Sequence, residues 1–379
     1  MDHLSLRLET ARSGPFTFQL GLELDTLTSL LERVGDVHEL FRESPLSTVA
    51  NSLEKAVLAS SIYGTNTIEG GLLTERETAA VLEMDPSELK EEEARRVANM
   101  KRAYDIATEA GKSPAWTLTP AFIREIHGAI TGGLGSVDKR NTPGQFRDNP
   151  KGTTTQVGSV ATGGTYKPPQ YGADIDKLVT ALCQWNAQLE AAGIPPLVRA
   201  PLVHLYFEWI HPFWDGNGRV GRVLEATILL SEGYRYAPFA LARYYLDEMQ
   251  HYFSLFNTCR KAAEKKAPAP LAPFVVFHLN GMLRTIKELH KRVNLMVGAL
   301  LFRTRLSVLH EEKAINLRQY TIVCQLMGEL LSVGQLRLQP WYQALYLRRG
   351  DRTRQRDLTE LKTMGLLEED EQGRLHPAW

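Results

Sequence analysis

Apolar residues recur at the spacing of an α-helix over most of the chain. Because residues three and four apart lie on one face of a helix, this pattern predicts helices that bury one side in a common core. We therefore expect an all-α fold. The predicted helices span residues 22–42, 48–62, 74–83, 86–110, 119–131, 173–192, 198–210, 218–232, 242–264, 269–290 and 291–312.

The segment between two of these helices reads His-Pro-Phe-Trp-Asp-Gly-Asn-Gly-Arg-Val-Gly-Arg, from His211 to Arg222. Pro212 prevents a simple continuation of the first helix, so the Gly-Asn-Gly at 216–218 is expected in a loop that opens the second. The start of a helix offers free N–H groups and the positive end of its dipole, which suits a phosphate. The glycines allow close approach of the backbone, and the Asn side chain adds an amide donor.

The charged side chains of this segment fit the same ligand. Arg219 and Arg222 are three residues apart, so both can flank one anion from the first turn of the helix. Asp215 offers a hard oxygen ligand where a Mg²⁺ ion bridging two phosphates would lie. His211 is a side chain that accepts a proton near neutral pH. An unusual loop between two core helices is the structural alternative, but the complete combination favours chemistry on a nucleoside triphosphate.

From His211 to Arg222 the chain resembles, at every defining position, the HPFx(D/E)GNGRxxR motif of the Fic family. Most members of this family transfer AMP from ATP to a hydroxyl side chain of a target protein. The resemblance implies that His211 is the general base that deprotonates the target Ser, Thr or Tyr. It also implies that Phe213 anchors the loop in the core and that Asp215 binds Mg²⁺ on the α- and β-phosphates.

The same resemblance implies a continuous phosphate site in the second half of the motif. In the family, the Gly-Asn-Gly turn forms the anion hole and the two arginines hold the β- and γ-phosphates. Doc-type kinases of the same fold have Ala-Asn-Lys in its place, so the glycine version favours adenylylation over phosphorylation. The residues assigned here to ATP and phosphate binding are Gly216, Asn217, Gly218, Arg219, Val220, Gly221 and Arg222.

Residues 65–70, Thr-Asn-Thr-Ile-Glu-Gly, resemble the (S/T)xxxE(G/N) inhibitory motif that many Fic proteins carry. The resemblance implies that Thr65, Glu69 and Gly70 form an inhibitory segment in which Glu69 pairs with Arg222. A carboxylate in the γ-phosphate site removes one phosphate clamp and repels ATP by like charge. Taken alone, these residues also fit a threonine that caps a surface helix.

A β-hairpin is expected after the segment Pro-Gly-Gln-Phe-Arg at 143–147. Short apolar runs at 157–160 and 166–169 enclose Gly- and Thr-rich residues, a pattern typical of a hairpin with a flexible tip. Fic proteins carry such a flap beside the active site, and its backbone pairs with the segment that bears the target hydroxyl. The resemblance therefore implies that the target protein docks on the flap. A plain surface hairpin is the alternative, and the polar residues at 153–156 and 162–165 make this flap unusually long and polar.

The resemblance covers about residues 50–265, and it sets the expected domain organisation. Its segment from Tyr244 to Phe253 resembles the family helix that borders the adenine pocket, with Tyr252 as the nearest match. Glu248-Met249 replaces the usual Asn-Arg pair, so Tyr252 as an ordinary core residue is an equal alternative. The expected domains are an N-terminal helical extension (1–49), a catalytic core that includes the inhibitory helix (50–265), connecting helices (266–312) and a C-terminal domain (313–379).

The C-terminal domain is expected to resemble a winged helix-turn-helix. Its predicted helices are 317–331, 341–347 and 352–362, followed by two strands around a charged turn. The third helix would be the reading helix, with Arg354, Arg356 and Lys362 available to phosphates or bases. Residues 341–379 hold as many acidic as basic side chains, whereas DNA binding through counterion release calls for a basic excess. The pattern favours dimerisation or protein docking over DNA reading, although DNA binding stays open.

Composition sets the frame for these motifs. The 44 acidic and 44 basic residues cancel, so no general attraction to nucleic acid or to a membrane is implied. The three cysteines show no metal-ligand spacing and no disulfide framework, which suits a reducing cytoplasm. No run reaches about 18 apolar residues and the N-terminus has no apolar signal-peptide core, so neither a membrane span nor a signal peptide is expected.

The sequence therefore predicts a protein nucleotidyltransferase. It would transfer AMP from Mg-ATP to a Ser, Thr or Tyr of a target protein and would be held back by Glu69. Three alternatives stay open: removal of AMP from a modified protein, with Glu69 orienting a water; a nucleotide-sensing DNA-binding regulator; and transfer of another nucleotide such as UMP or GMP.

Overall fold

The computed structural model describes residues 4–85, 88–113, 115–135 and 138–379. The chain forms two compact units. The larger unit consists of Met1–Glu43 and Ala50–His290, and the smaller one of Ser44–Val49 and Lys291–Trp379. These units are defined by packing, so the functional domain boundaries expected from the sequence stay a prediction.

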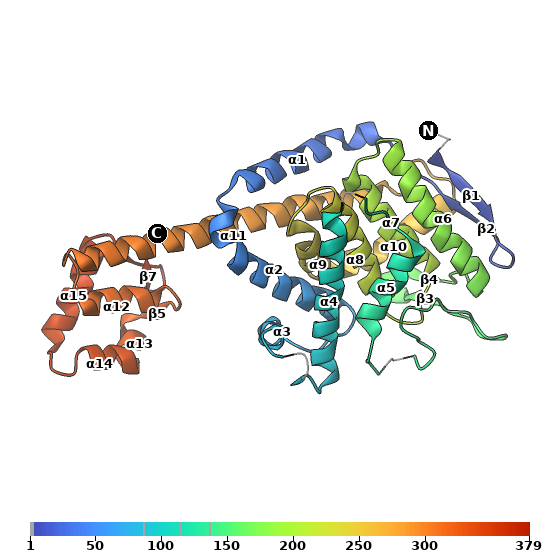
Figure 1. The fold of residues 1–379 in the computed structure, drawn as a ribbon. Coiled ribbons are helices and arrows are strands. Elements are labelled where there is room, and N and C mark those ends of the chain that lie inside the picture. Colours follow the sequence, from blue (N-terminus) through green and yellow to red (C-terminus); the bar gives the residue numbers. More distant parts are fainter. Residues whose placement is uncertain (1–3, 86–87, 114, 136–137) are drawn as a thin grey trace. The chain divides into compact units, whose positions relative to one another are not determined.

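The larger unit is built from helices, as expected for an all-α fold (Figure 1). Apart from shifted helix ends, the predicted and observed helices of this unit differ in two places. The predicted helix 242–264 is two helices that meet at Glu248, and the predicted helices 269–290 and 291–312 are one continuous helix. The helices are α1 (Thr28–Glu43), α2 (Leu46–Ile68), α3 (Glu75–Leu82), α4 (Glu92–Lys112), α5 (Pro120–Thr131), α6 (Gly172–Ala191), α7 (Pro196–Ile210), α8 (Asn217–Ser231), α9 (Ala237–Asp247), α10 (Met249–Glu264) and α11 (Ala272–Glu311).

Both differences have a local cause. The apolar period runs unbroken through Glu248, which has no Gly or Pro beside it to mark the turn between α9 and α10. No helix breaker separates His290 from Lys291 either, so the backbone of α11 continues where the sequence suggested two elements. The predicted helix 86–110 corresponds to α4, which begins at Glu92; its first two residues, 86–87, lie outside the described residues.

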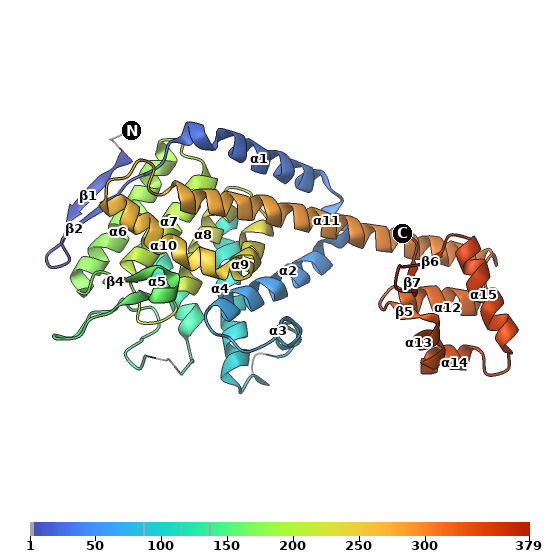
Figure 2. The ribbon, with the colours of Figure 1, turned by 180° about the vertical axis from the view of Figure 1, so that it is seen from behind.

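The pair α7 and α8 forms the centre of the larger unit. Nearly every residue of α7 is buried, which is typical of a helix enclosed on all sides. Helices α4, α5 and α6 pack around this pair (Figure 1), while α10 and the first half of α11 cover its other side (Figure 2). The loop between α7 and α8 therefore starts and ends in well-packed core.

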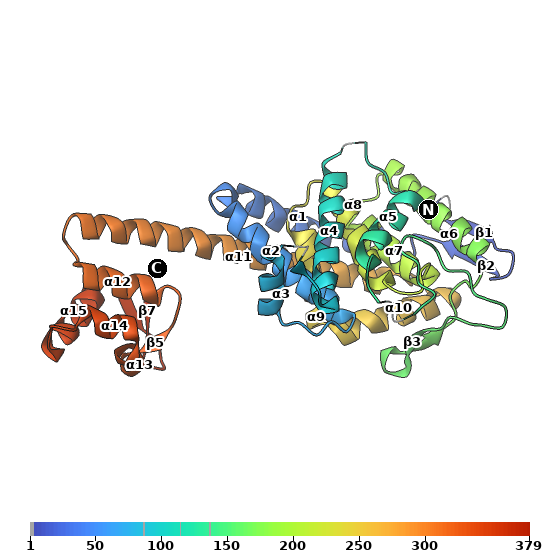
Figure 3. The same ribbon diagram turned by 60° about the horizontal axis from the view of Figure 1, so that its bottom comes forward.

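Two short antiparallel hairpins complete this unit. The first pairs β1 (Leu6–Glu9) with β2 (Pro15–Phe18). The N-terminal extension, which was predicted to be helical, therefore begins with a β-hairpin. Asp174 of α6 holds its turn, because its carboxylate accepts hydrogen bonds from the turn's backbone and from a serine hydroxyl. The second hairpin pairs β3 (Val157–Ser159) with β4 (Gly164–Tyr166), as expected for the flap, and lies beside α10 (Figure 3).

The smaller unit has its own core around two buried tyrosines and the buried carboxylate of Asp357. That carboxylate accepts hydrogen bonds from Arg318 (2.8 Å) and from Tyr346 (2.8 Å). The predicted helix 317–331 ends earlier than expected, and Leu331 lies in a strand instead. The elements are α12 (Leu317–Leu326), β5 (Leu331–Ser332), α13 (Val333–Leu338), α14 (Pro340–Leu345), α15 (Asp351–Thr363), β6 (Leu367–Glu369) and β7 (Arg374–Pro377), with the three strands in the order β5-β7-β6.

No helix in the described part of the chain combines the length and the apolar character that a membrane crossing requires.

The close approach of α11 to α9 gives a test of this packing. A Cβ at Gly281 would lie 2.5 Å from the Tyr244 ring, so Gly281→Ala is expected to lower the free energy of unfolding by about 1–3 kcal/mol through overpacking. Gly35 in α1 is the matched control, because a Cβ there meets nothing within 4 Å. Gly35→Ala is expected to raise the stability by about 0.5–1 kcal/mol, since alanine is the better helix former. Urea unfolding of both variants checks the difference, and similar stabilities would contradict this packing.

Candidate active site in the loop between α7 and α8

His211 ends α7 in a left-handed backbone conformation, with φ 50° and ψ 61°. Such a conformation is strained for a non-glycine residue and persists only where the surroundings impose it. Arg147 imposes it here. Its Nε donates to the His211 carbonyl (2.7 Å), its NH2 donates to the Ile210 carbonyl (3.4 Å), and its backbone N–H donates to the Pro212 carbonyl (2.8 Å). Burial lowers the pKa of Arg147 to about 10, which still leaves it charged at neutral pH.

His127 and Phe213 anchor the next part of the loop. The Phe213 ring is fully buried and stacks on the His127 ring, with centroids 3.6 Å apart. The backbone N–H of Gly144 donates to His127 Nδ1 (2.9 Å), so Nε2 carries the hydrogen and donates to the Asp215 carbonyl (3.0 Å). Burial lowers the pKa of His127 to about 4. The neutral His127 ring therefore fixes the loop through its hydrogen bond to the Asp215 carbonyl and its stacking on Phe213.

Asn217 closes the loop on itself. Its side-chain oxygen accepts from the Phe213 backbone N–H (2.9 Å), and its side-chain nitrogen donates to the Phe213 carbonyl (2.9 Å). Gly216, directly before it, has φ +84° as the N-cap of α8, a conformation that favours glycine. The two residues thus turn the chain so that α8 begins with its N-terminus facing the cavity beside His211.

Arg219, in the first turn of α8, carries N–H groups that lack hydrogen-bond acceptors in the described chain. Its side chain is almost fully buried, and its Nε and NH1 have no hydrogen-bond partner among the described residues. Its NH2 lies 3.3 Å from Asp215 Oδ1, an oxygen that also accepts from the Gly216 N–H (2.6 Å). Buried N–H groups without partners are rare in proteins. Their presence at a helix N-terminus fits an anionic ligand such as phosphate.

The Asp215 carboxylate also fits Mg²⁺, if phosphate oxygens and waters complete the coordination of the ion. Among the described residues, no group of three His, Cys, Asp or Glu side chains forms a metal-binding cluster. Mg²⁺ at phosphate sites, however, commonly uses one or two carboxylates together with phosphates and waters. Asp215 is the carboxylate present, and its side chain is 28% exposed.

Arg222, the second arginine, binds the predicted inhibitory segment. Its NH2 lies 2.7 Å from Glu69 Oε1, and its Nε donates to the Thr65 hydroxyl (2.8 Å). Burial alone would raise the pKa of Glu69, but the charge and hydrogen bond of Arg222 outweigh it, and the pKa is lowered. A Cβ on Gly218 would overlap the Glu69 carboxylate. The carboxylate therefore lies directly over the start of α8, where the backbone favours an anion. Gly70 follows Glu69 with φ +81°, which turns the chain away from α2.

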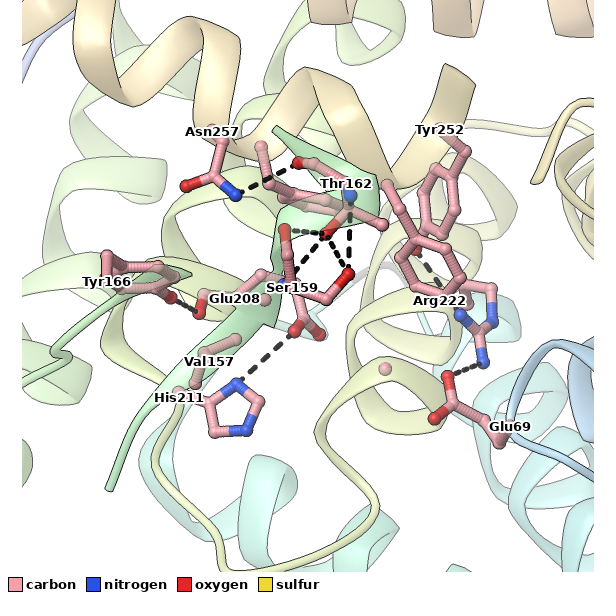
Figure 4. Close-up of a pocket in the computed structure, with 14 residues that line it drawn as sticks. Glu69, Val157, Ser159, Thr162, Tyr166, Glu208, His211, Arg222, Tyr252 and Asn257 are labelled. Atoms are coloured by element: carbon pink, nitrogen blue, oxygen red, sulfur yellow. Dashed lines mark hydrogen bonds and ion pairs between the residues drawn. The ribbon is translucent and has the colours of Figure 1, made fainter. Parts of the chain in front are cut away.

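Four of these residues, Glu69, His211, Gly218 and Arg222, line one cavity of about 270 Å³ (Figure 4). Asp215 and Arg219 are not part of its lining. Glu69, Arg222 and His211 lie toward one end, and the flap and aromatic residues of α10 form the other walls. Asn257 of α10 fastens the flap by donating to the carbonyls of Gly164 (2.6 Å) and Thr162 (3.2 Å). The cavity therefore joins the His211 imidazole, the Arg222 guanidinium, the start of α8 and an aromatic wall.

Of the remaining predicted residues, Tyr252 lines the cavity, whereas Val220 and Gly221 have packing contacts. Tyr252 is buried, and its hydroxyl hydrogen-bonds Arg222 (3.3 Å) and His204 (3.0 Å). The side chain of Val220 is fully buried in the core. Gly221 is required by the approach of α7 to α8, since a Cβ there would lie 2.7 Å from the His204 ring.

Sequence reasoning missed several groups around this site. The roles of Arg147 and His127 have no spacing signal, because each acts through contacts made across the fold. A buried network behind the cavity was also missed: Glu225 of α8 lies between His204 and His278 and accepts from the Tyr245 hydroxyl. Burial would raise the pKa of Glu225, but the two histidines outweigh it and lower it.

Comparison with known proteins adds independent findings. Residues 117–229 match the Fic/DOC family. The protein adenylyltransferase Fic of Drosophila ananassae is 26% identical over 238 residues, which is 62% of this chain and 43% of that protein. Its counterpart in Drosophila mojavensis is 27% identical over 246 residues, which is 60% of this chain and 45% of that protein. This chain thus spans less than half the length of these curated relatives.

Solved structures resemble the fold. A Fic domain containing signaling protein from Bacteroides thetaiotaomicron has a TM-score of 0.58 and 20% identity, covering 70% of this chain and 97% of that one. A Fic family protein from Desulfovibrio desulfuricans has a TM-score of 0.54 and 20% identity, covering 96% of this chain and 97% of that one. The expected all-α Fic fold is confirmed.

The buried His127 predicts a pH dependence of stability. Its folded pKa of about 4 lies below the ordinary value of 6.5, so the unfolded chain takes up the proton first as the pH falls. The stability that depends on neutral His127 is complete above pH 6.5 and is lost between pH 6.5 and about 4. The expected loss from about pH 7.5 to about pH 5 is roughly 2 kcal/mol, measured by urea unfolding. His127→Gln should show a shallower dependence, and an unchanged slope in that variant would contradict the assignment.

Proposed function

The chain belongs to the Fic/DOC family, and on this premise we propose that it is a protein adenylyltransferase. It transfers AMP from ATP to a Ser, Thr or Tyr hydroxyl of a target protein. The observation that carries the proposal is that His211, Arg222 and the start of α8 line one cavity, while buried, unpartnered Arg219 donors lie in the same first turn of α8. A phosphate chain would satisfy these donors.

In this proposal the triphosphate is held by groups of the first turn of α8 and of the loop before it. The backbone N–H groups at the start of α8 and Arg219 receive one phosphate, and Arg222 receives another once Glu69 has left it. Asp215 would hold Mg²⁺ against these phosphates, where the ion neutralises their charge. The adenine lies toward the aromatic side chains of α10 in the same cavity.

His211 then removes the proton from the target hydroxyl as its oxygen attacks the α-phosphorus. A bond forms between this oxygen and the α-phosphorus, and the bond from the α-phosphorus to the bridging oxygen of the β-phosphate breaks. Pyrophosphate leaves, and the proton stays on His211 until solvent takes it. The flap holds the acceptor segment by strand pairing, so the backbone fixes its register.

Glu69 restrains this reaction by occupying Arg222. The carboxylate lies over the start of α8, where it excludes the terminal phosphate both by volume and by charge. Removal of AMP from a modified protein is the second candidate activity. It is favoured by one observation: Glu69 and His211 line the same cavity, where the carboxylate can orient a water.

Removal of the Glu69 carboxylate is expected to activate the protein. In Glu69→Gly, ATP binding should tighten about 10- to 100-fold, because a hydrogen bond to a charged group contributes about 1.5–3 kcal/mol. Intact mass after incubation with Mg-ATP should show added AMP mainly in this variant. Adding His211→Ala should lower the rate by about 10²–10⁴-fold, the usual contribution of a general base.

Glu75→Gly is the matched control, since Glu75 also pairs with an arginine (Arg243, 2.8 Å) but lies outside the cavity. It should behave like the wild type. Equal labelling of the wild type and Glu69→Gly would contradict the inhibition. Release of AMP from a modified target by the wild type would favour the second candidate activity, the removal of AMP. Labelling with UTP or GTP in preference to ATP would show that another nucleotide is the co-substrate.

We further infer that the smaller unit docks a protein or a second copy of the chain in preference to DNA. The three basic side chains of α15 that would read DNA already have acidic partners: Arg354 pairs with Asp351, Arg356 with Glu360, and Lys362 with Glu369. The full chain is therefore expected to give no salt-dependent shift of duplex DNA in a gel. A shift that weakens steeply with salt would support the DNA-binding alternative.

A further inference from the structure

Two buried polar groups beside the cavity face each other without other partners. Glu208 lies in the last turn of α7, three residues before His211, and its Oε2 lies 3.6 Å from His211 Nδ1 (Figure 4). Their side chains are 12% and 20% exposed. Within the described chain, neither Glu208 Oε1 nor His211 Nδ1 has a hydrogen-bond partner. A buried polar atom left unsatisfied costs about 1–3 kcal/mol, so a small movement that closes this gap is favourable.

We propose that Glu208 is the positioning residue for His211: its carboxylate accepts the Nδ1–H of the imidazole and so turns Nε2 toward the target hydroxyl. The proposal rests on the proposed function. It adds to that function the group that fixes the orientation and the tautomer of the base.

The surroundings hold Glu208 in this position. The Tyr166 hydroxyl of the flap donates to the Glu208 carbonyl, which fixes the backbone. The absence of a side chain at Gly221 leaves space for the carboxylate, because a Cβ there would lie 2.9 Å from Glu208 Oε1. Arg147 fixes the carbonyl of His211 on the other side. The two side chains therefore have little freedom except to approach each other.

No other carboxylate of the described cavity lining is available for this role. Glu69 is bound to Arg222, and its carboxylate lies over the start of α8. The cavity's phenols are engaged as well: Tyr166 with the Glu208 carbonyl and Tyr252 with His204 and Arg222. The geometry leaves Glu208 as the group that meets His211 Nδ1.

The chemistry requires this arrangement. A neutral imidazole with its hydrogen on Nδ1 has its lone pair on Nε2, which can accept the proton of the target hydroxyl. When Nε2 takes that proton, the imidazolium lies beside the Glu208 side chain, whose charge stabilises it. Without Glu208, the hydrogen can move to Nε2, and the imidazole then presents a donor to a hydroxyl that needs an acceptor.

Kinetics of the full chain in the Glu69→Gly background test the proposal. Glu208→Gln keeps the shape of the side chain but can turn its amide donors toward Nδ1. We expect kcat to fall about 10- to 100-fold, part of what a general base contributes, while KM for ATP stays within about twofold. In the Glu69→Gly/His211→Ala background, Glu208→Gln should cause no further loss, because Glu208 acts through His211. If Glu208→Gln does not fold, Glu208→Asp replaces it, with a smaller loss of kcat from the shorter reach.

A second readout does not depend on turnover. In protein labelled with ¹⁵N-histidine, the His211 signals are those missing from His211→Ala, and their shifts report which nitrogen carries the hydrogen. We expect the Nδ1–H form in Glu69→Gly and a loss of that form in Glu208→Gln. Glu225→Gln is the matched control, since Glu225 is a buried carboxylate that contacts His204 and His278.

The outcomes separate the two proposals. If kcat is unchanged in Glu208→Gln, or falls equally with and without His211, the positioning role is overturned. The same holds if the His211 tautomer does not change in Glu208→Gln, or changes equally in Glu225→Gln. If Glu69→Gly transfers no AMP, the proposed function fails, and the tautomer measurement alone then decides the interaction between Glu208 and His211.

Discussion

The buried guanidinium of Arg222 is the constraint on which the site depends. A charge removed from water needs an anion beside it, because an unpaired buried ion costs several kcal/mol. In this structure the anion is Glu69, at 2.7 Å. A phosphate in the same place would satisfy the same need, so under the proposed function the two anions would compete for one cation. In the structure this site is filled by the protein's own carboxylate.

Backbone carbonyls, more than side chains, shape the loop that carries His211. Arg147 binds three of them, those of residues 210, 211 and 212, His127 binds a fourth, and the Asn217 side chain binds the Phe213 backbone. Hydrogen bonds to the backbone fix the path of a chain independently of its side chains. The strained conformation of His211 is a result of this fixation, and it aims the imidazole into the cavity instead of along α7.

The local parts of this site could be predicted from the sequence, and the parts formed across the fold could not. Pro212 and Gly216 mark the loop because each restricts or frees the backbone at its own position. The pairing of Glu69 with Arg222, 153 residues apart, followed only from resemblance to a family. Nothing near Arg147 in the chain shows that it meets His211, since that contact depends on how distant segments pack. Glu208, in contrast, lies three residues before His211 at the end of α7, a local spacing that could have been read from the sequence. The break at Glu248 was missed for a related reason, because the apolar face continues through it.

Arg222 also ends a helix. At the last turn of α2 the Glu69 N–H bonds the Asn66 carbonyl instead of that of Thr65, and Arg222 NH2 donates to the Thr65 carbonyl in its place. The guanidinium thus caps the C-terminus of α2, 157 residues away in the chain. A ligand that drew this guanidinium away from Thr65 would remove the cap together with the ion pair, so occupation of the anion site is expected to destabilise the last turn of α2.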